Sequence, residues 1–142
     1  MEGEQLEQDL DFRFPSDVQY IEGIVEQVVS RCEAHAFPRR MLALNVPVAL
    51  TEAISNAILR GNNQDLGKSV RVRADVDAHR LIVEVRDEGA GFDLRACTED
   101  PTTAENLLRE DGRGLFLMQR LMDQVERFTD GGNVVRLVLR RG

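Results

Sequence analysis

The sequence predicts a two-layer α/β (α+β) sandwich, in which a mixed, mostly antiparallel sheet carries helices on one face. Three observations predict it. Strand-like alternation and helix-like periodicity both occur, and they follow the order strand, two helices, two strands, helix, two strands. The 142 residues suffice for one core between two packed layers. We expect a single domain at residues 9–142, after a flexible polar leader at residues 1–8.

The first half of the chain supplies a strand and two helices. Apolar residues alternate with charged ones at residues 10–14, which predicts a half-buried strand. Apolar positions then recur every three or four residues at 20–29, as in a helix that buries one face. In the second helix, Asn45 is expected to be the N-cap, so that Pro47 lies in the first turn and Gly61 ends the helix.

The second half of the chain supplies two hairpins and a third helix. Two strands joined by a turn are predicted at residues 70–87, and a final hairpin at residues 125–139. Helical spacing covers residues 115–125. Between the first hairpin and this helix, periodicity is lost at residues 92–113. Because structureless connections of that length are uncommon in compact domains, we expect a binding loop or lid there.

The composition argues against nucleic acid and membrane as direct partners. With 18 Lys and Arg against 25 Asp and Glu, the net charge is -7, which offers no electrostatic footprint for a phosphate backbone. No apolar run approaches the roughly 18 residues that cross a bilayer, and the acidic start lacks signal-peptide features. Cys32 and Cys97 have no paired spacing, so we expect no disulfide framework, no zinc site and a cytoplasmic location.

The second predicted helix is mostly apolar but keeps Glu52 and Asn56 four residues apart on one stripe. Burying a carboxylate and a carboxamide without partners is costly, so both are expected to face a ligand. Nucleotide-bound Mg²⁺ suits this pair, because it takes oxygen ligands and typically uses only one or two from the protein. The alternative is that Asn56 hydrogen-bonds a neighbouring loop and that Glu52 pairs with Arg60 or another Arg.

Two glycine clusters flank the predicted lid. In the first, residues 87–91, Asp87 can accept a hydrogen bond from an amino group such as that of adenine, and Gly89 and Gly91 allow the chain to approach a planar ligand closely. In the second, residues 112–114 directly precede an apolar helix, where free N–H groups and the helix dipole form an anion site. Taken singly, each cluster is also explained as a turn or as loop punctuation.

In this order, the motifs resemble the ATP-binding Bergerat fold of the GHKL group, which includes gyrase-type ATPases, ninety-kilodalton heat-shock chaperones, sensor histidine kinases and mismatch-repair proteins. Residues 52–56 correspond to its N box, residues 87–91 to its first glycine box and residues 112–114 to its second. Within the group, the small size of the chain and the segment 50–57 are most similar to bacterial anti-sigma-factor serine/threonine protein kinases.

The resemblance implies a role for each matching residue. Asn56 would ligate Mg²⁺, and Asp87 would select adenine. Glu52 would orient or deprotonate a serine hydroxyl on a protein substrate, while Arg113, or as second choice Arg109, would supply a catalytic cation. The chain departs from many relatives in two places, since they often carry His and Thr at the positions of Arg60 and Asn133. The cofactor-binding positions implied besides Asn56 and Asp87 are Arg60, Gly89, Gly91, Gly112, Gly114 and Asn133.

By this resemblance, the protein is expected to be an ATP-dependent kinase that phosphorylates an anti-sigma-factor antagonist and sequesters a sigma factor, with ATP or ADP and Mg²⁺ as cofactors. The alternative is a nucleotide-gated protein-binding module without phosphotransfer activity. The resemblance also points to a homodimer. Phe12 and Tyr20 are apolar residues that either form such an interface or lie in the core.

Overall fold

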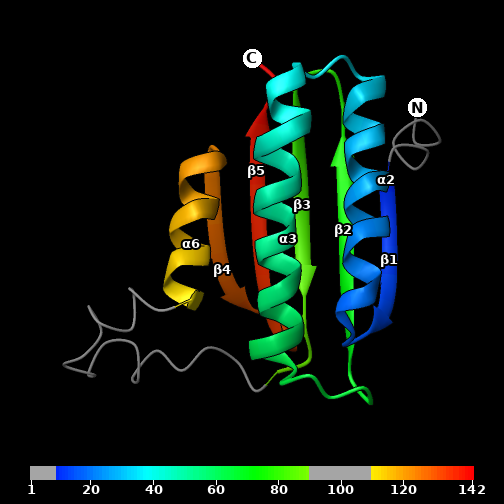
Figure 1. Ribbon diagram of the computed structural model, residues 1–142, viewed down its shortest axis with the longest axis vertical. Coiled ribbons are helices and arrows are strands. Elements are labelled where there is room, and N and C mark those ends of the chain that lie inside the picture. Colours follow the sequence, from blue (N-terminus) through cyan, green and yellow to red (C-terminus); the bar gives the residue numbers. More distant parts are fainter. Residues whose placement is uncertain (1–8, 90–109) are drawn as a thin grey trace.

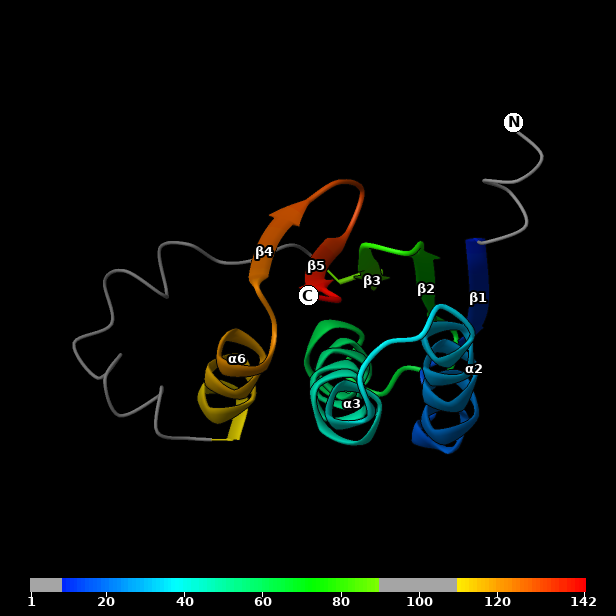
Figure 2. The same cartoon turned by 90° about the horizontal axis from the view of Figure 1, so that it is seen from above.

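The described part of the chain folds into two layers, a five-stranded sheet and three helices that all lie on one face of it (Figures 1 and 2). The computed structural model describes residues 9–89 and 110–142. The predicted leader at residues 1–8 and residues 92–109 of the predicted lid lie outside the described residues. Within the described part, the predicted two-layer sandwich with helices on one face is confirmed.

The sheet has the strand order β1-β2-β3-β5-β4, and every described pair of neighbours is antiparallel. Both predicted hairpins are present, as β2 with β3 and as β4 with β5. Side chains alternate between the two faces, and the helix-facing row Phe12, Val72, Val85 and Val135 crosses four strands in register. The strands are β1 (Asp9–Pro15), β2 (Ser69–Val76), β3 (Arg80–Arg86), β4 (Gln124–Thr129) and β5 (Asn133–Arg140).

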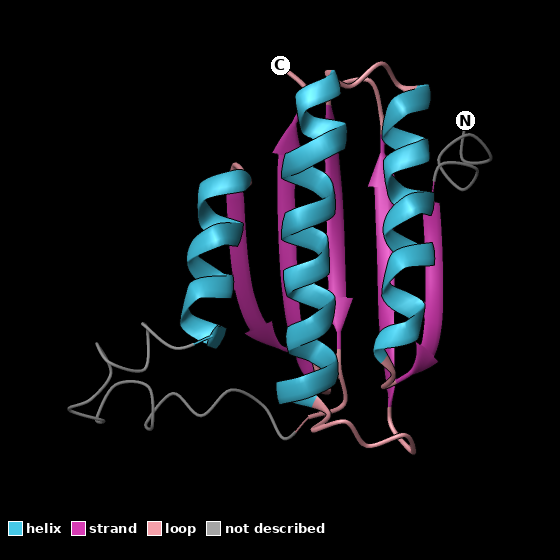
Figure 3. Cartoon of the chain, in the orientation of Figure 1, coloured by secondary structure: helices cyan, strands magenta, loops and turns pink. Residues whose placement is uncertain are grey.

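The three helices lie against one face of the sheet (Figure 3), and their buried apolar side chains belong to the core. They are α2 (Ile21–Ala34), α3 (Val46–Asn56) and α6 (Glu110–Leu121). A short 3-10 turn, Val18–Tyr20, leads into α2, and the Asp17 side chain caps it by accepting the N–H of Gln19 at 3.0 Å. The central helix α3 packs against α2 on one side and α6 on the other.

The predicted start of the second helix is wrong. Asn45 has helical backbone angles and makes no cap; its Nδ2 instead donates to the carbonyl of Leu121 at 2.8 Å. The helix already runs through a wide π turn at Met41–Asn45, where the N–H of Val46 bonds the carbonyl of Met41. A proline ring clashes with the carbonyl four residues earlier in an ordinary α-helix. The wider turn before Pro47 lets the helix continue where the sequence pattern indicated a new start.

This continuity produces a helical stretch, Met41–Gly61, of 21 residues that contains an 18-residue window with a mean hydropathy of 1.5, which is long and apolar enough to cross a membrane. The expectation that no apolar run approaches this length is therefore wrong for the described residues. The stretch is nevertheless the central helix of the sandwich, with five side chains of α3 buried in the core. A core helix passes the same test of length and composition, so the stretch is weak support for a membrane span.

The third helix also departs from its predicted bounds. Its described part begins at Glu110, so residues 110–113 of the predicted lid are helical, and the cluster 112–114 lies inside the helix instead of ahead of it. It ends at Leu121, and β4 then begins at Gln124. The prediction placed these glycines ahead of the helix, yet Gly114 lies within α6, where it faces Glu52 of α3.

The two residues considered for an interface occupy different environments. Phe12 is partly buried and packs against the core, whereas Tyr20 is 41% exposed and its ring tilts against that of Phe14, with the centroids 5.7 Å apart. The face of the sheet opposite the helices carries charged side chains, including ion pairs of Arg71 with Asp11 and of Arg136 with Glu84, both 2.7 Å. This face is therefore suited to solvent.

Candidate functional site

The fold brings the described residues of the predicted site together at one end of the molecule. This end holds the C-terminal ends of α3 and β3, the N-terminal end of α6 and the start of β5, all at the bottom of Figure 1. Glu52 and Asn56 lie on α3, Asp87 and Gly89 directly follow β3, and Gly114 lies on α6. Asn133 is the first residue of β5. Residues 52, 56, 87, 89, 114 and 133 are thus drawn from four elements that are far apart in sequence.

Asp87 is the most strongly held of these residues, with only 6% of its surface exposed. Its Oδ1 accepts hydrogen bonds from the N–H of Gly89 at 2.7 Å, the N–H of Asn133 at 3.3 Å and the Nδ2 of Asn133 at 3.0 Å. Burial raises the pKa of Asp87 because it disfavours the charged form, and these hydrogen bonds partly oppose that rise. The segment 87–89, called the Asp87 loop below, therefore presents a fixed carboxylate.

Glycines allow the chain to pack this tightly around Asp87. A Cβ placed on Gly61 would overlap Oδ2 of Asp87, and a Cβ on Gly89 would overlap the carbonyl of Gly61. Gly132 has a φ of +153°, and a Cβ there would overlap the main-chain carbonyl of Asp87. Each of these three overlaps involves main-chain atoms or the short, buried side chain of Asp87. In a closely packed interior such groups cannot move aside. Any larger residue at these positions would displace the Asp87 loop.

Asn62 is a site residue that the sequence reasoning missed. It is fully buried, and its Nδ2 donates to Ser16 Oγ and to the carbonyl of Ser69, both at 2.9 Å. Its Oδ1 accepts the N–H of Glu88 at 2.7 Å, so it ties the end of the long helix to the Asp87 loop. The available signal was an Asn directly after the glycine that ends an apolar helix, which alone does not distinguish a buried anchor from a turn.

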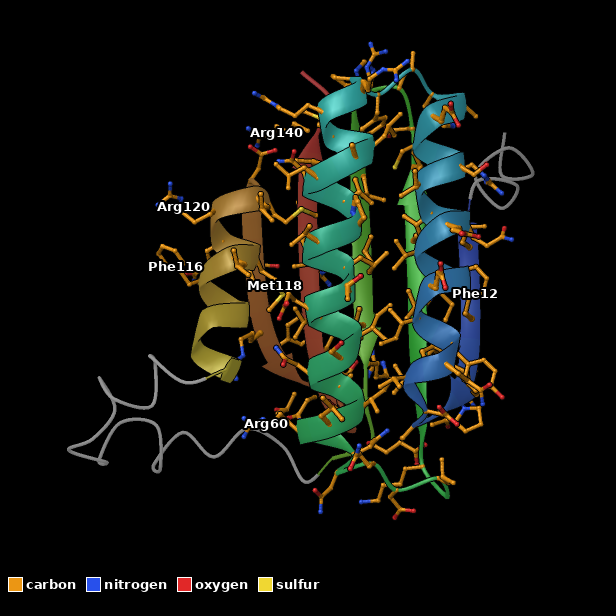
Figure 4. The ribbon with its side chains drawn as sticks, viewed as in Figure 1. Phe12, Arg60, Phe116, Met118, Arg120 and Arg140 are labelled. Carbon is orange, nitrogen blue, oxygen red and sulfur yellow. The ribbon has the colours of Figure 1, made fainter. Side chains whose placement is uncertain are left out.

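The second part of the site is the contact between α3 and α6. A Cβ on the buried Gly114 would lie 2.6 Å from Oε1 of Glu52 and 3.4 Å from Nδ2 of Asn56. Next along α6, Met118 points towards α3 and is 2% exposed (Figure 4). We call Glu52, Asn56 and Gly114 the α3–α6 seam. Both polar side chains of the seam are half-buried.

The position of the second glycine cluster changes what its members can contribute. The described part of α6 begins at Glu110, so Gly112 lies within helical backbone, and the anion site expected of its N–H stays a prediction. The contribution of Gly114 is the absence of a side chain beside Glu52.

Three predicted residues cannot be placed in full. Gly91 and Arg109 lie outside the described residues, and Arg113 is described only as part of the helical backbone of α6. Arg60 is exposed and extends from the C-terminal end of the long helix (Figure 4). The roles of Arg109 and Arg113 therefore stay predictions. Arg60 lies at the same end of the molecule as Asp87 and Asn56.

The described residues contain no group of three or more His, Cys, Asp and Glu side chains that could hold a metal ion. Mg²⁺ does not need such a cluster, because it keeps several waters and uses one or two protein oxygens with substrate phosphates. The carboxamide of Asn56 beside the carboxylate of Glu52 supplies hard oxygen donors of this kind. The donor set of the seam therefore fits Mg²⁺ bound together with a phosphorylated ligand.

Comparisons with known proteins agree with this geometry. The family described as a histidine kinase-like ATPase domain matches residues 14–139. The chain is 32% identical over 136 residues to the serine-protein kinase RsbW of Bacillus pumilus, covering 90% of this chain and 83% of that protein. It is 30% identical over 121 residues to RsbW of Bacillus subtilis, covering 82% of this chain and 75% of the relative.

A third relative is the anti-sigma F factor of Clostridium beijerinckii, which is 26% identical over 129 residues and matches 81% of this chain and 90% of its own length. The family match includes every described site residue, from Glu52 on α3 to Asn133 on β5. The family description itself names an ATPase, which identifies ATP as the ligand for which the fold is built. The chain belongs to the family of histidine kinase-like ATPase domains.

Proposed function

We propose that the protein is an ATP-dependent serine/threonine kinase that acts as an anti-sigma factor. One observation carries the proposal: the fold places a hydrogen-bonded carboxylate, Asp87, at the same end of the molecule as the seam formed by Glu52, Asn56 and Gly114. Relatives whose names are serine-protein kinase and anti-sigma factor support the same reading. A site of this kind can bind a nucleotide both at its base and at its phosphates.

The nucleotide would lie between the two parts of the site. The adenine amino group would donate to Oδ2 of Asp87, and Gly89 would let the chain pass against the base. The phosphates would face the end of α6 that holds Gly112, where the helix dipole and main-chain N–H groups would favour an anion. Asn56 would hold Mg²⁺, which would neutralise charge on the phosphates when bound.

Glu52 would perform the proton chemistry of the transfer. The hydroxyl oxygen of a substrate serine would form a bond to the γ-phosphorus, while the bond from that phosphorus to the β,γ-bridging oxygen breaks and leaves ADP. The hydroxyl proton would pass to Oε1 or Oε2 of Glu52. Arg113, or alternatively Arg109, would supply positive charge to the transferring group, and Arg60 would contact the cofactor from the end of the helix.

The partners follow from the same proposal. The substrate would be an anti-sigma-factor antagonist that carries the serine or threonine, and the sequestered partner would be a sigma factor. We also propose a homodimer and a cytoplasmic location. A net charge of -7 supports protein partners over direct contact with nucleic acid, and the packing of the long apolar helix in the core supports a protein that does not bind membranes.

The proposal is tested by measuring transfer of label from γ-labelled ATP to the cognate antagonist. Wild type should transfer label, whereas Glu52→Ala should lose transfer by about 100-fold or more and still bind ATP. Glu26→Ala, which removes an exposed carboxylate from α2, is the matched control and should behave as wild type. If wild type binds ATP but moves no label, the kinase proposal fails and a nucleotide-gated binding module remains.

A further inference from the structure

The peptide unit between Asp87 and Glu88 is held from two sides. Its carbonyl lies against Gly132, where a Cβ would overlap it. Its N–H, which belongs to Glu88, donates to Oδ1 of Asn62 at 2.7 Å, and the described residues offer this N–H no other acceptor. Because the peptide unit is planar, holding it limits rotation of the main chain at Asp87 and therefore the direction of the carboxylate.

A chain of hydrogen bonds leads from this peptide unit to the end of β1. The N–H of Glu88 donates to Asn62, Nδ2 of Asn62 donates to Oγ of Ser16 at 2.9 Å, and that hydroxyl donates to the carbonyl of Lys68 at 2.9 Å. Nδ2 of Asn62 also donates to the carbonyl of Ser69 at 2.9 Å. An N–H group only donates and a carbonyl only accepts, so the carboxamide of Asn62 has one allowed orientation.

The side chain of Glu88 provides a second, weaker anchor for the same loop. Its Oε2 accepts the N–H of Ser69 at 2.6 Å and the hydroxyl of Ser69 at 2.7 Å, and these hydrogen bonds lower the pKa of Glu88. This anchor is exposed, where water competes for both groups, whereas Asn62 and Ser16 are 0% and 3% exposed. A buried N–H that loses its acceptor bears the full cost of desolvation. The buried anchor is therefore the stronger one.

We propose that Asn62 is a positioning residue of the nucleotide site and that Ser16 orients it, so that the end of β1 sets the direction of the Asp87 carboxylate. The inference rests on the proposed contact between Asp87 and adenine. Asn62 has no exposed surface, and its Nδ2 and Oδ1 are bonded within the protein, so it acts through the loop and not on the nucleotide. A contact made by one fixed oxygen weakens when the direction of that oxygen varies.

The two residues have unequal shares in this control. Without the hydroxyl of Ser16, the carboxamide of Asn62 keeps the carbonyl of Ser69 as an acceptor. Without the carboxamide of Asn62, the N–H of Glu88 loses its described acceptor. Ser16 reaches the loop only through Asn62. Its effect on nucleotide binding is therefore the smaller of the two, and it disappears once Asn62 is replaced.

The experiment measures the affinity of the full chain for ATP with Mg²⁺ by calorimetry, together with kcat and KM for phosphoryl transfer. The variants are Ser16→Ala, Asn62→Leu and the double variant. We expect ATP binding to weaken by about threefold in Ser16→Ala and by about tenfold in Asn62→Leu. The double variant should match Asn62→Leu. KM for ATP should rise while kcat stays close to wild type, because Glu52 lies in the seam and not in the loop.

Asp17→Ala is the matched control, since it changes the neighbour of Ser16 at the same junction between β1 and α2. Asp17 accepts the N–H and the side-chain amide of Gln19 and makes no described hydrogen bond to Asn62. Its removal should lower the melting temperature and leave ATP affinity unchanged. Weaker ATP binding in Asp17→Ala, to the same degree as in Ser16→Ala, would overturn the inference, because any disturbance of the junction would then have this effect.

A second measurement decides the case if Asn62→Leu does not fold. Amide hydrogen exchange, followed by NMR without nucleotide, should be faster at Glu88 in Ser16→Ala than in wild type and unchanged at Val85 in the middle of β3. Unchanged exchange at Glu88, additive losses in the double variant, or normal ATP affinity in a folded Asn62→Leu would each overturn the inference. Failure of the proposed function looks different, because wild type would bind no ATP while Ser16 would still control exchange at Glu88.

Discussion

The Asp87 loop and the α3–α6 seam are built by different forces. The loop is held by hydrogen bonds from two buried asparagines, Asn62 and Asn133, and Asp87 is almost fully buried. The seam is a contact between two helices, in which Glu52 and Asn56 lie against a glycine and are only half-buried. The difference shows that one end of the site is fixed before any ligand arrives, whereas the other keeps side-chain freedom.

This division suits the two tasks of the proposed site. Selecting a base requires a hydrogen-bonding pattern that does not adapt, because an adaptable acceptor would also fit the wrong base. Holding a phosphate and accepting a proton requires a carboxylate that can reorient as charge moves. Substitutions that affect the two regions differently therefore test the comparison directly.

The largest effect is expected from Gly61→Ala. A Cβ at this position overlaps a carboxylate that three hydrogen bonds hold in place. Glycine to alanine in a helix ordinarily stabilises by about 0.5–1 kcal/mol. Here we expect destabilisation by about 2 kcal/mol and ATP binding weaker by about 100-fold. Thermal unfolding and calorimetry measure the two quantities.

Gly23→Ala on α2 is the control for that substitution, because nothing lies within 4 Å of its added Cβ. It should raise stability by about 0.5–1 kcal/mol and leave ATP affinity unchanged. A Gly61→Ala protein as stable as Gly23→Ala would mean that the Asp87 loop shifts freely. The two regions would then not differ in rigidity.

An intermediate effect is expected from Asp87→Asn, which should separate binding from stability. Burial raises the pKa of Asp87, so the stability associated with this group is fully present below its unfolded pKa and is lost as pH rises through the folded pKa. Asparagine does not ionise and avoids that loss. We expect a melting temperature at pH 7 equal to or above that of wild type, with ATP affinity lower by about 10- to 100-fold.

The pH dependence sharpens the Asp87→Asn prediction. Melting temperatures should be measured from pH 4 to pH 8. The melting temperature of the variant should rise relative to that of wild type as pH rises, since only wild type must hold a buried charge at high pH. If the melting temperature of the variant instead fell relative to that of wild type as pH rises, the hydrogen bonds to Oδ1 would outweigh the effect of burial on the pKa of Asp87. The loop would then stabilise the charged form instead of merely tolerating it.

The smallest effect on binding is expected from Gly114→Ala in the seam. Its Cβ would meet Oε1 of Glu52 at 2.6 Å, but that oxygen is the end of a flexible side chain that can turn aside. Stability and ATP affinity should therefore stay close to wild type, while kcat for phosphoryl transfer should fall by about tenfold as Glu52 is displaced. Steady-state kinetics that separate kcat from KM provide the measurement.

A double variant tests whether Glu52 carries the Gly114→Ala effect. Shortening the carboxylate with Glu52→Asp should make the two substitutions non-additive in kcat, because the shorter side chain no longer meets the added methyl group. Additive losses would place the effect of Gly114 elsewhere on α6. A large loss of ATP affinity in Gly114→Ala would show that the seam is as rigid as the Asp87 loop.

Most of the secondary structure could be predicted from the sequence because it follows from the periodic spacing of apolar residues within short segments. The strand at residues 10–14 and both hairpins were confirmed, since alternating side chains face either the helices or solvent. The exceptions lie where a local proline or glycine signal is overridden by contacts with other elements. Pro47 indicated a helix start but follows a π turn, and the glycines near residue 112 indicated a loop but lie in α6.

The candidate site residues could be selected from the sequence, but their contacts could not. Asp87, Asn133, Glu52, Asn56 and Gly114 were all selected from sequence, and the structure places them at one end of the molecule. Asn62 was missed because its role depends on partners that are remote in sequence, such as Ser16, which is 46 residues away. A buried anchor of this kind has no local pattern, since its partners are chosen by the packing of the sheet edges.

The sequence by itself determined the order of strands and helices and the set of side chains available at the site, because both depend on residues within a few positions of one another. Only the tertiary structure decided that Oδ1 of Asp87 is occupied and that Gly114 packs beside Glu52. These contacts depend on how closely distant segments approach. That approach is set by packing across the whole core, which no short stretch of sequence encodes.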